Sequence, residues 1–382
     1  MDVATMLAPL FEPLEVGPVT LRNRFVMPGM QREWCVDGVP TPRLAEYYRR
    51  RAAGGTALII SEACAVDHPS ATQRPVFAWL AERSRDAWAR CVDAVRGEGA
   101  EFFMQLWHEG AYPGRRGEIR PGDPPALSPS GLMTADRPNG RALTTAELDE
   151  IEAAFVRSAL LARSIGASGV EVHACHGYLL DQFLWHETNR RDDGFGGADL
   201  RDRLRFPTRV IAAVREAVGP DMAVSVRFSQ WKEADYQARI AETPDELRVV
   251  VEAFEAAGAD MLHSSTRRFW TPEWPELDAD LGLAGWVRRF ARVPVAAVGS
   301  LGLATDVMTR LNGRPAEQIG LPAFEELLRR FERGDFDLMT VGRAQIADPD
   351  WVAKVRRGAI EELRAYDSVA AERELEEFVA AS

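Results

Sequence analysis

Short runs of apolar, often β-branched residues alternate with longer amphipathic stretches along most of the chain. We expect eight of these runs to be strands, because each is too short for a helix and is bounded by turn residues. The runs lie at residues 24–30, 56–62, 101–106, 169–173, 222–228, 260–264, 293–299 and 337–341. Strands that alternate with helices in this way indicate parallel β–α units.

Helix start and stop signals lie between the runs. Thr41, Thr144 and Thr243 each precede a helical pattern, and the last two are followed three residues later by a glutamate, the spacing of a capping box. The glycine pair at 54–55 is expected to end the first helix. The basic run at 49–51 falls on that helix and is expected to be a solvated helix end rather than a phosphate site.

Eight β–α units without a break in composition favour a single (β/α)₈ TIM barrel. We expect one domain over residues 1–382, with the barrel at about 24–358 and a charged helical tail at 359–382. An open doubly wound sheet is the alternative. The first strand lacks the Gly-x-Gly-x-x-Gly turn that such a sheet uses to bind dinucleotides, which favours the barrel.

Charge and cysteine spacing restrict the class of protein. A net charge of −12 argues against nucleic acid, whose binding needs a basic surface. No apolar run approaches the length of a membrane span, and the acidic residues near the start are unlike a signal peptide. The four cysteines are too widely spaced for a zinc pair or an iron–sulfur run. We therefore expect a cytoplasmic protein, and its sequence leaves monomer and homodimer open.

Polar residues and glycines gather where the predicted strands end, the face on which barrels carry their active sites. The candidates are Pro28, Gly29, Met30, Gln31, Gln105, His173, His176, Tyr178, Arg227, Gly299, Ser300, Gly342 and Arg343. Glycine turns after the last two strands, together with Arg343, supply the backbone N–H groups and the guanidinium that favour a phosphate.

His173 ends the fourth predicted strand and His176 and Tyr178 follow it, a set of side chains that suits a site handling a carbonyl oxygen and a proton. Two other interpretations stay open: the side chains are ordinary core residues, or the histidines bind a metal. A third ligand is not obvious nearby, and no His-Glu-x-x-His pattern is present, so we favour catalysis over metal binding.

Two long connections, at residues 110–143 and 266–280, follow the third and sixth predicted strands. The second carries Phe269, Trp270 and Trp274. Because barrel active sites are assembled from loops of this kind, both connections are candidate pocket walls, and Phe269 and Trp270 are candidate substrate contacts.

Several longer motifs resemble one enzyme family. They are LFEPL at 10–14, LRNRFVM at 21–27, QLWHEG at 105–110 and HACHGYLLDQFL at 173–184, continued by NRR at 189–191 and RLRF at 203–206. Together they resemble the Old Yellow Enzyme family of FMN-dependent ene-reductases, from about residue 10 to about residue 351. The resemblance implies an N-terminal hairpin ahead of the barrel.

The resemblance also implies roles for the matching residues. Arg227 and Gln105 would contact the pyrimidine end of FMN, residues 28–31 would lie against its ring, and the phosphate would bind at Gly299, Ser300, Gly342 and Arg343. His173 and His176 would donate hydrogen bonds to the substrate's carbonyl oxygen, and Tyr178 would protonate the α-carbon.

Some positions depart from the family pattern. Gln31 stands where Thr or Cys is usual beside the flavin, Phe195 replaces a common Tyr, Ser300 a usual Gly, and Asp202 a usual Asn. The larger relatives that carry an iron–sulfur cluster need a cysteine run and a further domain, and neither is expected in this sequence.

We therefore expect a flavoenzyme that passes hydride from NADH or NADPH to an activated C=C bond, such as that of an enone or a nitroalkene. Three alternatives stay open: an FMN-dependent amine dehydrogenase or demethylase, a flavin-free barrel lyase or isomerase, and a flavin-binding protein with vestigial chemistry.

Overall fold

Eight parallel strands close into a barrel in the computed structural model, which describes residues 2–112, 125–303 and 320–366. In chain order the barrel strands are β3 (Phe25–Met27), β6 (Leu58–Ile60), β9 (Glu101–Trp107), β14 (Gly169–His176), β15 (Ala223–Lys232), β16 (Met261–Ser265), β17 (Val295–Val298) and β18 (Leu338–Thr340). Pairing of β18 with β3 and of β9 with β14 completes the ring. The TIM barrel is confirmed, and the open doubly wound sheet is excluded.

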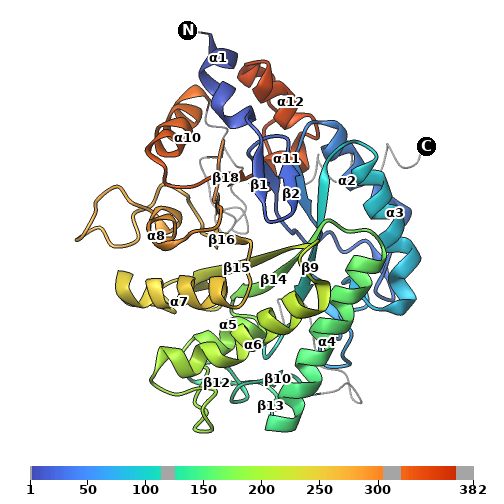
Figure 1. Ribbon diagram of the computed structural model, residues 1–382, viewed down its shortest axis with the longest axis vertical. Helices are drawn as coiled ribbons and strands as arrows, with labels where there is room; N and C mark the ends of the chain where they lie inside the picture. Colours follow the sequence, from blue (N-terminus) through green and yellow to red (C-terminus); the bar gives the residue numbers. More distant parts are fainter. Residues whose placement is uncertain (1, 113–124, 304–319, 367–382) are drawn as a thin grey trace.

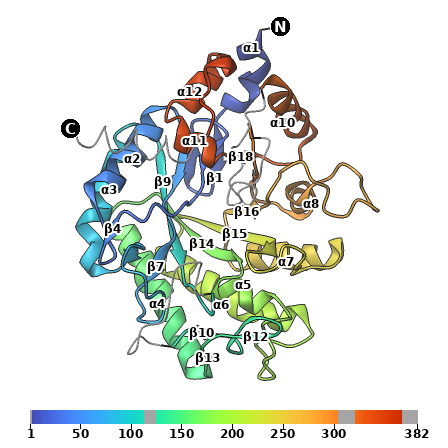
Figure 2. The same cartoon turned by 180° about the vertical axis from the view of Figure 1, so that it is seen from behind.

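Helices surround the strands (Figures 1 and 2). The longer ones are α2 (Pro42–Ala53), α3 (Arg85–Arg96), α4 (Thr145–Ser164), α6 (Leu200–Val218), α7 (Pro244–Ala256), α8 (Leu283–Phe290) and α10 (Leu321–Arg333). The shorter ones are α1 (Val3–Leu7), α5 (Leu179–Leu184), α11 (Arg343–Ala347) and α12 (Trp351–Arg356), with 3₁₀ turns at Ala8–Phe11, Glu82–Ser84 and Ile360–Glu362. No helix in the described ranges is long and apolar enough to cross a bilayer.

The expected helix signals act as caps in two of three cases. Thr144 and Glu147 form a reciprocal capping box at the start of α4. At α7 the Thr243 hydroxyl accepts from the Glu246 N–H, but the Glu246 carboxylate accepts from another backbone N–H, that of Glu242. Thr41 caps nothing with its side chain, because its hydroxyl donates to the carbonyl oxygen of Trp34.

A hairpin of β1 (Leu14–Val16) and β2 (Val19–Leu21) covers the N-terminal end of the barrel. Its side chains join an apolar layer of strand residues inside the ring, which comprises Val16, Val19, Leu21, Val26, Leu58, Ile60, Phe103, Ala223, Met261, Ala296 and Leu338. This layer closes one end of the barrel, and the C-terminal strand ends, where barrel active sites lie, are at the other.

The connections carry small sheets outside the barrel. β7 (Cys64–Val66) and β8 (Trp79–Leu80) are joined to the barrel sheet itself, because β7 pairs in parallel with β9 as well as with β8. The separate two-stranded sheets are β4 (Cys35–Val36) with β5 (Val39–Pro40), β10 (Leu127–Ser128) with β13 (Arg141–Ala142), and β11 (Leu132–Thr134) with β12 (Arg137–Pro138). The last two pairs belong to the first long connection, of which residues 113–124 lie outside the described part.

The prediction of a helical tail is wrong for residues 359–366, the part of the tail that the structure describes. Gly358 has a φ of +75°, which ends α12, and only Ile360–Glu362 form a 3₁₀ turn before the backbone becomes extended at Leu363. Leu363 and Tyr366 are buried against the domain. Residues 367–382 of the predicted tail lie outside the described residues.

Candidate active site

A cavity of about 410 Å³ lies at the C-terminal ends of the barrel strands. Twelve of the predicted site residues line it: Gly29, Met30, Gln31, Gln105, His173, His176, Tyr178, Arg227, Gly299, Ser300, Gly342 and Arg343. Pro28 is not among the lining residues, but its ring lies near Gly342. A Cβ placed on Gly342 would be 3.4 Å from Cγ of Pro28. Residues from six different strand ends are thus brought to one place.

The two histidines and the tyrosine form one aromatic cluster at the end of β14. The ring centre of His173 lies 5.4 Å from that of His176 and 5.2 Å from that of Tyr178. The chain turns sharply between them, since His176 and Gly177 have φ angles of +66° and +91°. This turn directs both His176 and Tyr178 into the cavity that His173 lines from the strand itself.

A buried ion pair stabilises the turn between His176 and Tyr178. The Lys232 ammonium donates to Oδ1 of Asp181 over 2.7 Å, and both side chains are fully buried. The other carboxylate oxygen of Asp181 accepts from the backbone N–H of Gly177 at 2.6 Å. Strand β15, helix α5 and the His176–Tyr178 turn are therefore fixed to one another by a single carboxylate.

The three side chains are held in neutral forms. Burial, reinforced by the charge of Arg227, lowers the pKa of His173 to about 3 and that of His176 well below its usual value. Burial and the nearby Glu233 carboxylate raise the pKa of Tyr178 well above its usual value. At neutral pH the cavity therefore contains two neutral imidazoles and a protonated phenol, which donates to Glu233 over 3.3 Å.

Ser265 joins His176 to Arg227. Its hydroxyl oxygen lies 2.7 Å from Nε2 of His176 and accepts from a guanidinium N–H of Arg227 over 3.2 Å. The Ser265 hydroxyl, which can donate one hydrogen bond and accept two, therefore connects the imidazole of His176 to the guanidinium of Arg227.

The turns after β17 and β18 meet at one side of the cavity. Ser300 has a φ of +55°, the left-handed region that favours the glycine usual at this position. Its hydroxyl donates to the carbonyl oxygen of Arg267 and accepts from Arg343, each over 3.0 Å. A Cβ on Gly299 would lie 2.7 Å from the backbone nitrogen of Phe269, so this turn has room only for glycine.

The expectation for the basic run was wrong at Arg51. Its guanidinium is buried and donates to the carbonyl oxygens of Gln345 and Ile346 in α11 over 3.0 and 2.8 Å. It also lies 3.8 Å above the ring of Tyr47. Arg51 therefore anchors the short helix that begins at Arg343, whereas Arg49 pairs with glutamates at the surface as expected of a solvated helix end.

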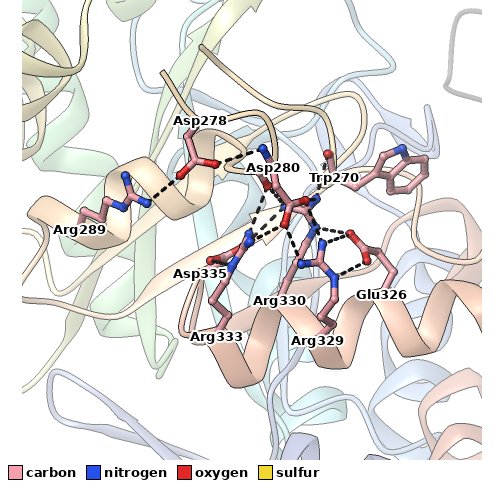
Figure 3. Close-up of polar contacts among 9 residues, drawn as sticks. All are labelled: Trp270, Asp278, Asp280, Arg289, Glu326, Arg329, Arg330, Arg333 and Asp335. Carbon is pink, nitrogen blue, oxygen red and sulfur yellow. Dashed lines mark hydrogen bonds and ion pairs between the residues drawn. The ribbon is translucent and has the colours of Figure 1, made fainter. Parts of the chain in front are cut away.

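Phe269 and Trp270 are not among the residues that line the cavity. Phe269 is buried against Phe336 and Trp270, and the Trp270 carbonyl oxygen accepts from Arg330. Figure 3 shows the ion-pair network that holds this connection on α10, with Asp280 accepting from Arg329, Arg330 and Arg333. The connection contributes Thr266 and Arg267 to the cavity in place of its aromatic rings.

Trp231 supplies an aromatic wall beside His176, and sequence reasoning missed it. Its ring centre lies 4.6 Å from that of His176, and its indole N–H donates to the Ser265 carbonyl oxygen over 3.1 Å. The predicted fifth strand stopped at Phe228, whereas β15 continues to Lys232. Extending the period of two from Arg227 through Ser229 would have placed Trp231 on the cavity side.

Comparison with known proteins identifies the family. Residues 9–321 match the sequence profile of the NADH:flavin oxidoreductase / NADH oxidase family. The chain belongs to this family. The predicted Old Yellow Enzyme relationship is thereby confirmed, and the family implies FMN and a nicotinamide hydride donor.

Two relatives and one structure illustrate the similarity. The chain is 34% identical over 365 residues to an NADH oxidase of Thermoanaerobacter brockii, covering 93% of this chain and 52% of that protein. It is 32% identical over 369 residues to 12-oxophytodienoate reductase 7 of Oryza sativa subsp. japonica, covering 92% and 89%. Morphinone reductase in complex with tetrahydroNAD has a similar structure, with a TM-score of 0.77, 27% identity, and coverage of 95% and 93%.

The lengths of the relatives differ. The chain spans about half of the Thermoanaerobacter NADH oxidase, and likewise 50% of a metal reductase of Desulforamulus reducens. The match to the rice reductase of this Old Yellow Enzyme family extends over most of both chains.

The cavity has the polar groups that an Old Yellow Enzyme needs to bind FMN. Both amide atoms of Gln31, Nε of Arg227 and the hydroxyl of Thr340 are buried without a hydrogen-bond partner among the described residues, and all three residues line the cavity. A Cβ on Gly29 would lie 2.6 Å from the Ser61 carbonyl oxygen and 2.8 Å from Oε1 of Gln105. Buried polar groups of this kind require partners, which the edge of a flavin ring would supply.

A third candidate metal ligand lies closer than the sequence indicated. The ligand atoms of His173, Cys175 and His176 are within 4.8 Å of one another in the described part of the chain. Cys175 is fully buried outside the cavity lining, and burial raises the pKa of its thiol well above the usual value. A metal ion would need the thiolate, so this group of side chains favours the neutral hydrogen-bonding role.

Proposed function

We propose that this protein is an FMN-dependent ene-reductase, which uses NADH or NADPH to reduce the activated C=C bond of an α,β-unsaturated carbonyl compound or a nitroalkene. The observation that carries the proposal is the meeting of His173, His176 and Tyr178 in one cavity with Gln105 and Arg227. Bound FMN would supply the chemistry of hydride transfer, accepting hydride from the nicotinamide and delivering it to the alkene.

The chain's own residues would hold the flavin at both ends. Gln105 and Arg227 would contact its pyrimidine edge, where the fixed charge of Arg227 favours the anionic reduced state. Ser300 and Arg343, already joined by a 3.0 Å hydrogen bond, would bind the phosphate. The bare backbone at Gly29 would allow the ring to approach closely.

His173 and His176 would bind the substrate's carbonyl or nitro oxygen. Negative charge develops on that oxygen as hydride reaches the β-carbon, and aimed N–H donors stabilise it. Because both imidazoles are neutral, they donate one hydrogen bond each without adding a positive charge to the site. An amine substrate has no such oxygen, so the pair favours alkene reduction over amine oxidation.

Tyr178 would deliver the proton to the α-carbon. Its raised pKa keeps the phenol protonated at neutral pH, and its hydroxyl can exchange its proton with Glu233 at the edge of the cavity. The flavin-side hydride and the Tyr178 proton would then reach the two alkene carbons from different directions.

The test measures the two half-reactions separately in Tyr178→Phe. Reduction of the flavin by NAD(P)H needs no proton on carbon and should stay near the parental rate. Reoxidation by an enone should slow by about 10²- to 10⁴-fold, the usual effect of losing a positioned acid. Oxygen should still reoxidise the flavin at the parental rate.

Tyr112→Phe is the matched control, because its ring packs 5.5 Å from that of Tyr178 but does not line the cavity. It should leave both half-reactions unchanged. Parental enone rates in Tyr178→Phe would show that another group supplies the proton. A parental protein that binds no FMN, or that reoxidises only with oxygen, would refute the ene-reductase assignment.

A further inference from the structure

A fully buried carboxylate lies beneath the cavity, inside the barrel. Glu171 on β14 accepts from Nε2 of Gln105 over 2.8 Å with one oxygen. Its other oxygen accepts from the Ser225 hydroxyl over 3.0 Å and lies 2.8 Å from Nδ1 of His263. Burying a carboxylate is costly, and the proposed reaction does not itself use this group.

The carboxylate determines which way the Gln105 amide points. An ionised carboxylate only accepts hydrogen bonds, so the atom of Gln105 that faces it is the NH₂ group. The amide cannot turn over without leaving Glu171 without that donor. Its oxygen Oε1 is therefore the atom left for a ligand in the cavity, where it accepts from an N–H group such as the one on the pyrimidine edge of a flavin.

Glu171 also carries a charge close to Arg227. Burial alone would raise its pKa, but the hydrogen bonds from His263 and the Gln105 amide and the charge of Arg227 lower the pKa below the usual value, so the group is ionised. Burial lowers the pKa of His263, which is consequently neutral and donates from Nδ1. In the described part of the chain Glu171 has no ion pair with Lys or Arg, so Arg227 balances its charge from a distance.

The positions of the two charges relative to the cavity follow from the strand register. Glu171 is paired with Ser225, and the next inward positions, His173 and Arg227, are paired with each other and line the cavity. A ligand above this layer therefore experiences the guanidinium of Arg227 directly and the carboxylate of Glu171 from one layer below.

We propose that Glu171 is a positioning residue for the flavin, which holds the Gln105 oxygen toward the cavity and offsets part of the positive charge of Arg227. Its charge thereby keeps the flavin midpoint potential below the value that Arg227 alone would give. The inference rests on the proposed function, since it concerns the site of the same cofactor.

Glu171→Gln tests the charge while keeping the shape of the side chain. The variant should retain FMN, because its amide oxygen still accepts from Gln105. Without the negative charge, the equilibrium constant for reduction of the bound flavin should rise about tenfold over the parental value. For a two-electron couple this raises the midpoint potential by ~30 mV. An unchanged or lower potential in the FMN-bound variant would overturn the charge role, and so would a folded variant that no longer binds FMN.

Two further variants separate charge from orientation. Glu171→Asp keeps the charge, so the midpoint potential should stay near the parental value. Its side chain is one methylene shorter and no longer reaches Gln105, so FMN should bind at least tenfold more weakly. Ser225→Ala, the matched control, removes one hydrogen bond to the same carboxylate without a change of charge and should leave the potential unchanged. Parental FMN affinity in Glu171→Asp would overturn the orienting role. If the parental protein itself bound no FMN, the proposed function would fail before any variant was compared.

Discussion

Replacing Lys232 by methionine would test how the barrel holds its catalytic turn. The lysine is fully buried, and its ammonium donates to Asp181 and to the carbonyl oxygens of Ser229 and Gln230. Methionine has a similar length and no charge, so the substitution leaves Asp181 as an uncompensated buried carboxylate. Loss of one partner from a buried ion pair costs about 3–5 kcal/mol of unfolding free energy.

The pH dependence follows from the pKa of Asp181. Burial raises it to about 6 even with Lys232 present, and the lysine lowers it, so Lys232→Met should raise it further. The pKa of Asp181 is therefore higher in the folded protein than in the unfolded chain. The stability that this carboxyl contributes is present at low pH and is lost as the pH rises toward the pKa in the folded protein. As the pH rises to about 6, the parent and the variant lose this stability equally. Above pH 6 only the variant continues to lose stability, by about 1.4 kcal/mol per pH unit.

Urea unfolding of the FMN-loaded proteins at pH 6 and pH 8 measures this difference. The gap between the parent and Lys232→Met should widen from pH 6 to pH 8, by as much as about 3 kcal/mol. In Asp181→Asn/Lys232→Met no charge remains, the Asn oxygen still accepts from the Gly177 N–H, and the pH-dependent part of the gap should vanish. Lys354→Met is the control for the functional readout, because Lys354 also pairs with a buried carboxylate, that of Asp348, but lies away from the turn.

A gap of the same size at both pH values would show that Asp181 is not the group left uncompensated. The function provides a second readout, since Asp181 anchors the turn between His176 and Tyr178. Enone reoxidation should slow in Lys232→Met and stay parental in Lys354→Met.

Three further outcomes are expected. Arg343→Ala should weaken FMN binding about 10- to 150-fold in a fluorescence titration, since a charge-assisted hydrogen bond contributes about 1.5–3 kcal/mol; unchanged affinity would place the phosphate elsewhere. Gln31→Thr should keep FMN bound but shift its midpoint potential, because the buried Gln31 amide has no partner in the described residues; an unchanged potential would mean that Gln31 does not contact the ring. Asp280→Asn should lower stability by about 1 kcal/mol and increase hydrogen exchange at residues 266–282 with FMN affinity unchanged; parental exchange would mean that the arginines of α10 do not restrain this connection.

The fold was predictable because its signals are local and repeated. Each predicted strand overlaps an observed one, since a buried parallel strand shows itself as a short apolar run. The main error in length was at β15, where Trp231 and Lys232 follow Ser229 in a stretch that looks polar and loop-like. Lys232 is nevertheless buried, because a carboxylate on α5 compensates its charge, and no local pattern identifies that partner.

The candidate site was predictable where its residues lie at strand ends, and not where it depends on distant pairs. His173 and Arg227 could be placed from the period of the strands. The contact between Glu171 and His263 joins residues 92 positions apart, and Arg51 reaches a carbonyl oxygen 294 positions away. Sequence reasoning assigned Arg51 to solvent, because arginines on helices are usually exposed, and missed the open carbonyl oxygens of α11 that it satisfies.

The buried charges of strands β14 and β15 are better explained by the site than by stability. Replacing a buried ion pair with apolar groups of similar shape is often neutral or stabilising, so a barrel filled by Val and Leu at these positions would fold at least as well. Yet Glu171 and Lys232 lie on the two strands that carry His173 and Arg227, and their hydrogen bonds end on Gln105 and, through Asp181, on Gly177. Apolar side chains exclude water but do not fix the direction of an amide or hold the N–H of a turn. An apolar replacement of the Lys232 and Asp181 pair is therefore expected to match the parent in stability and to fall below it in the rate of enone reduction.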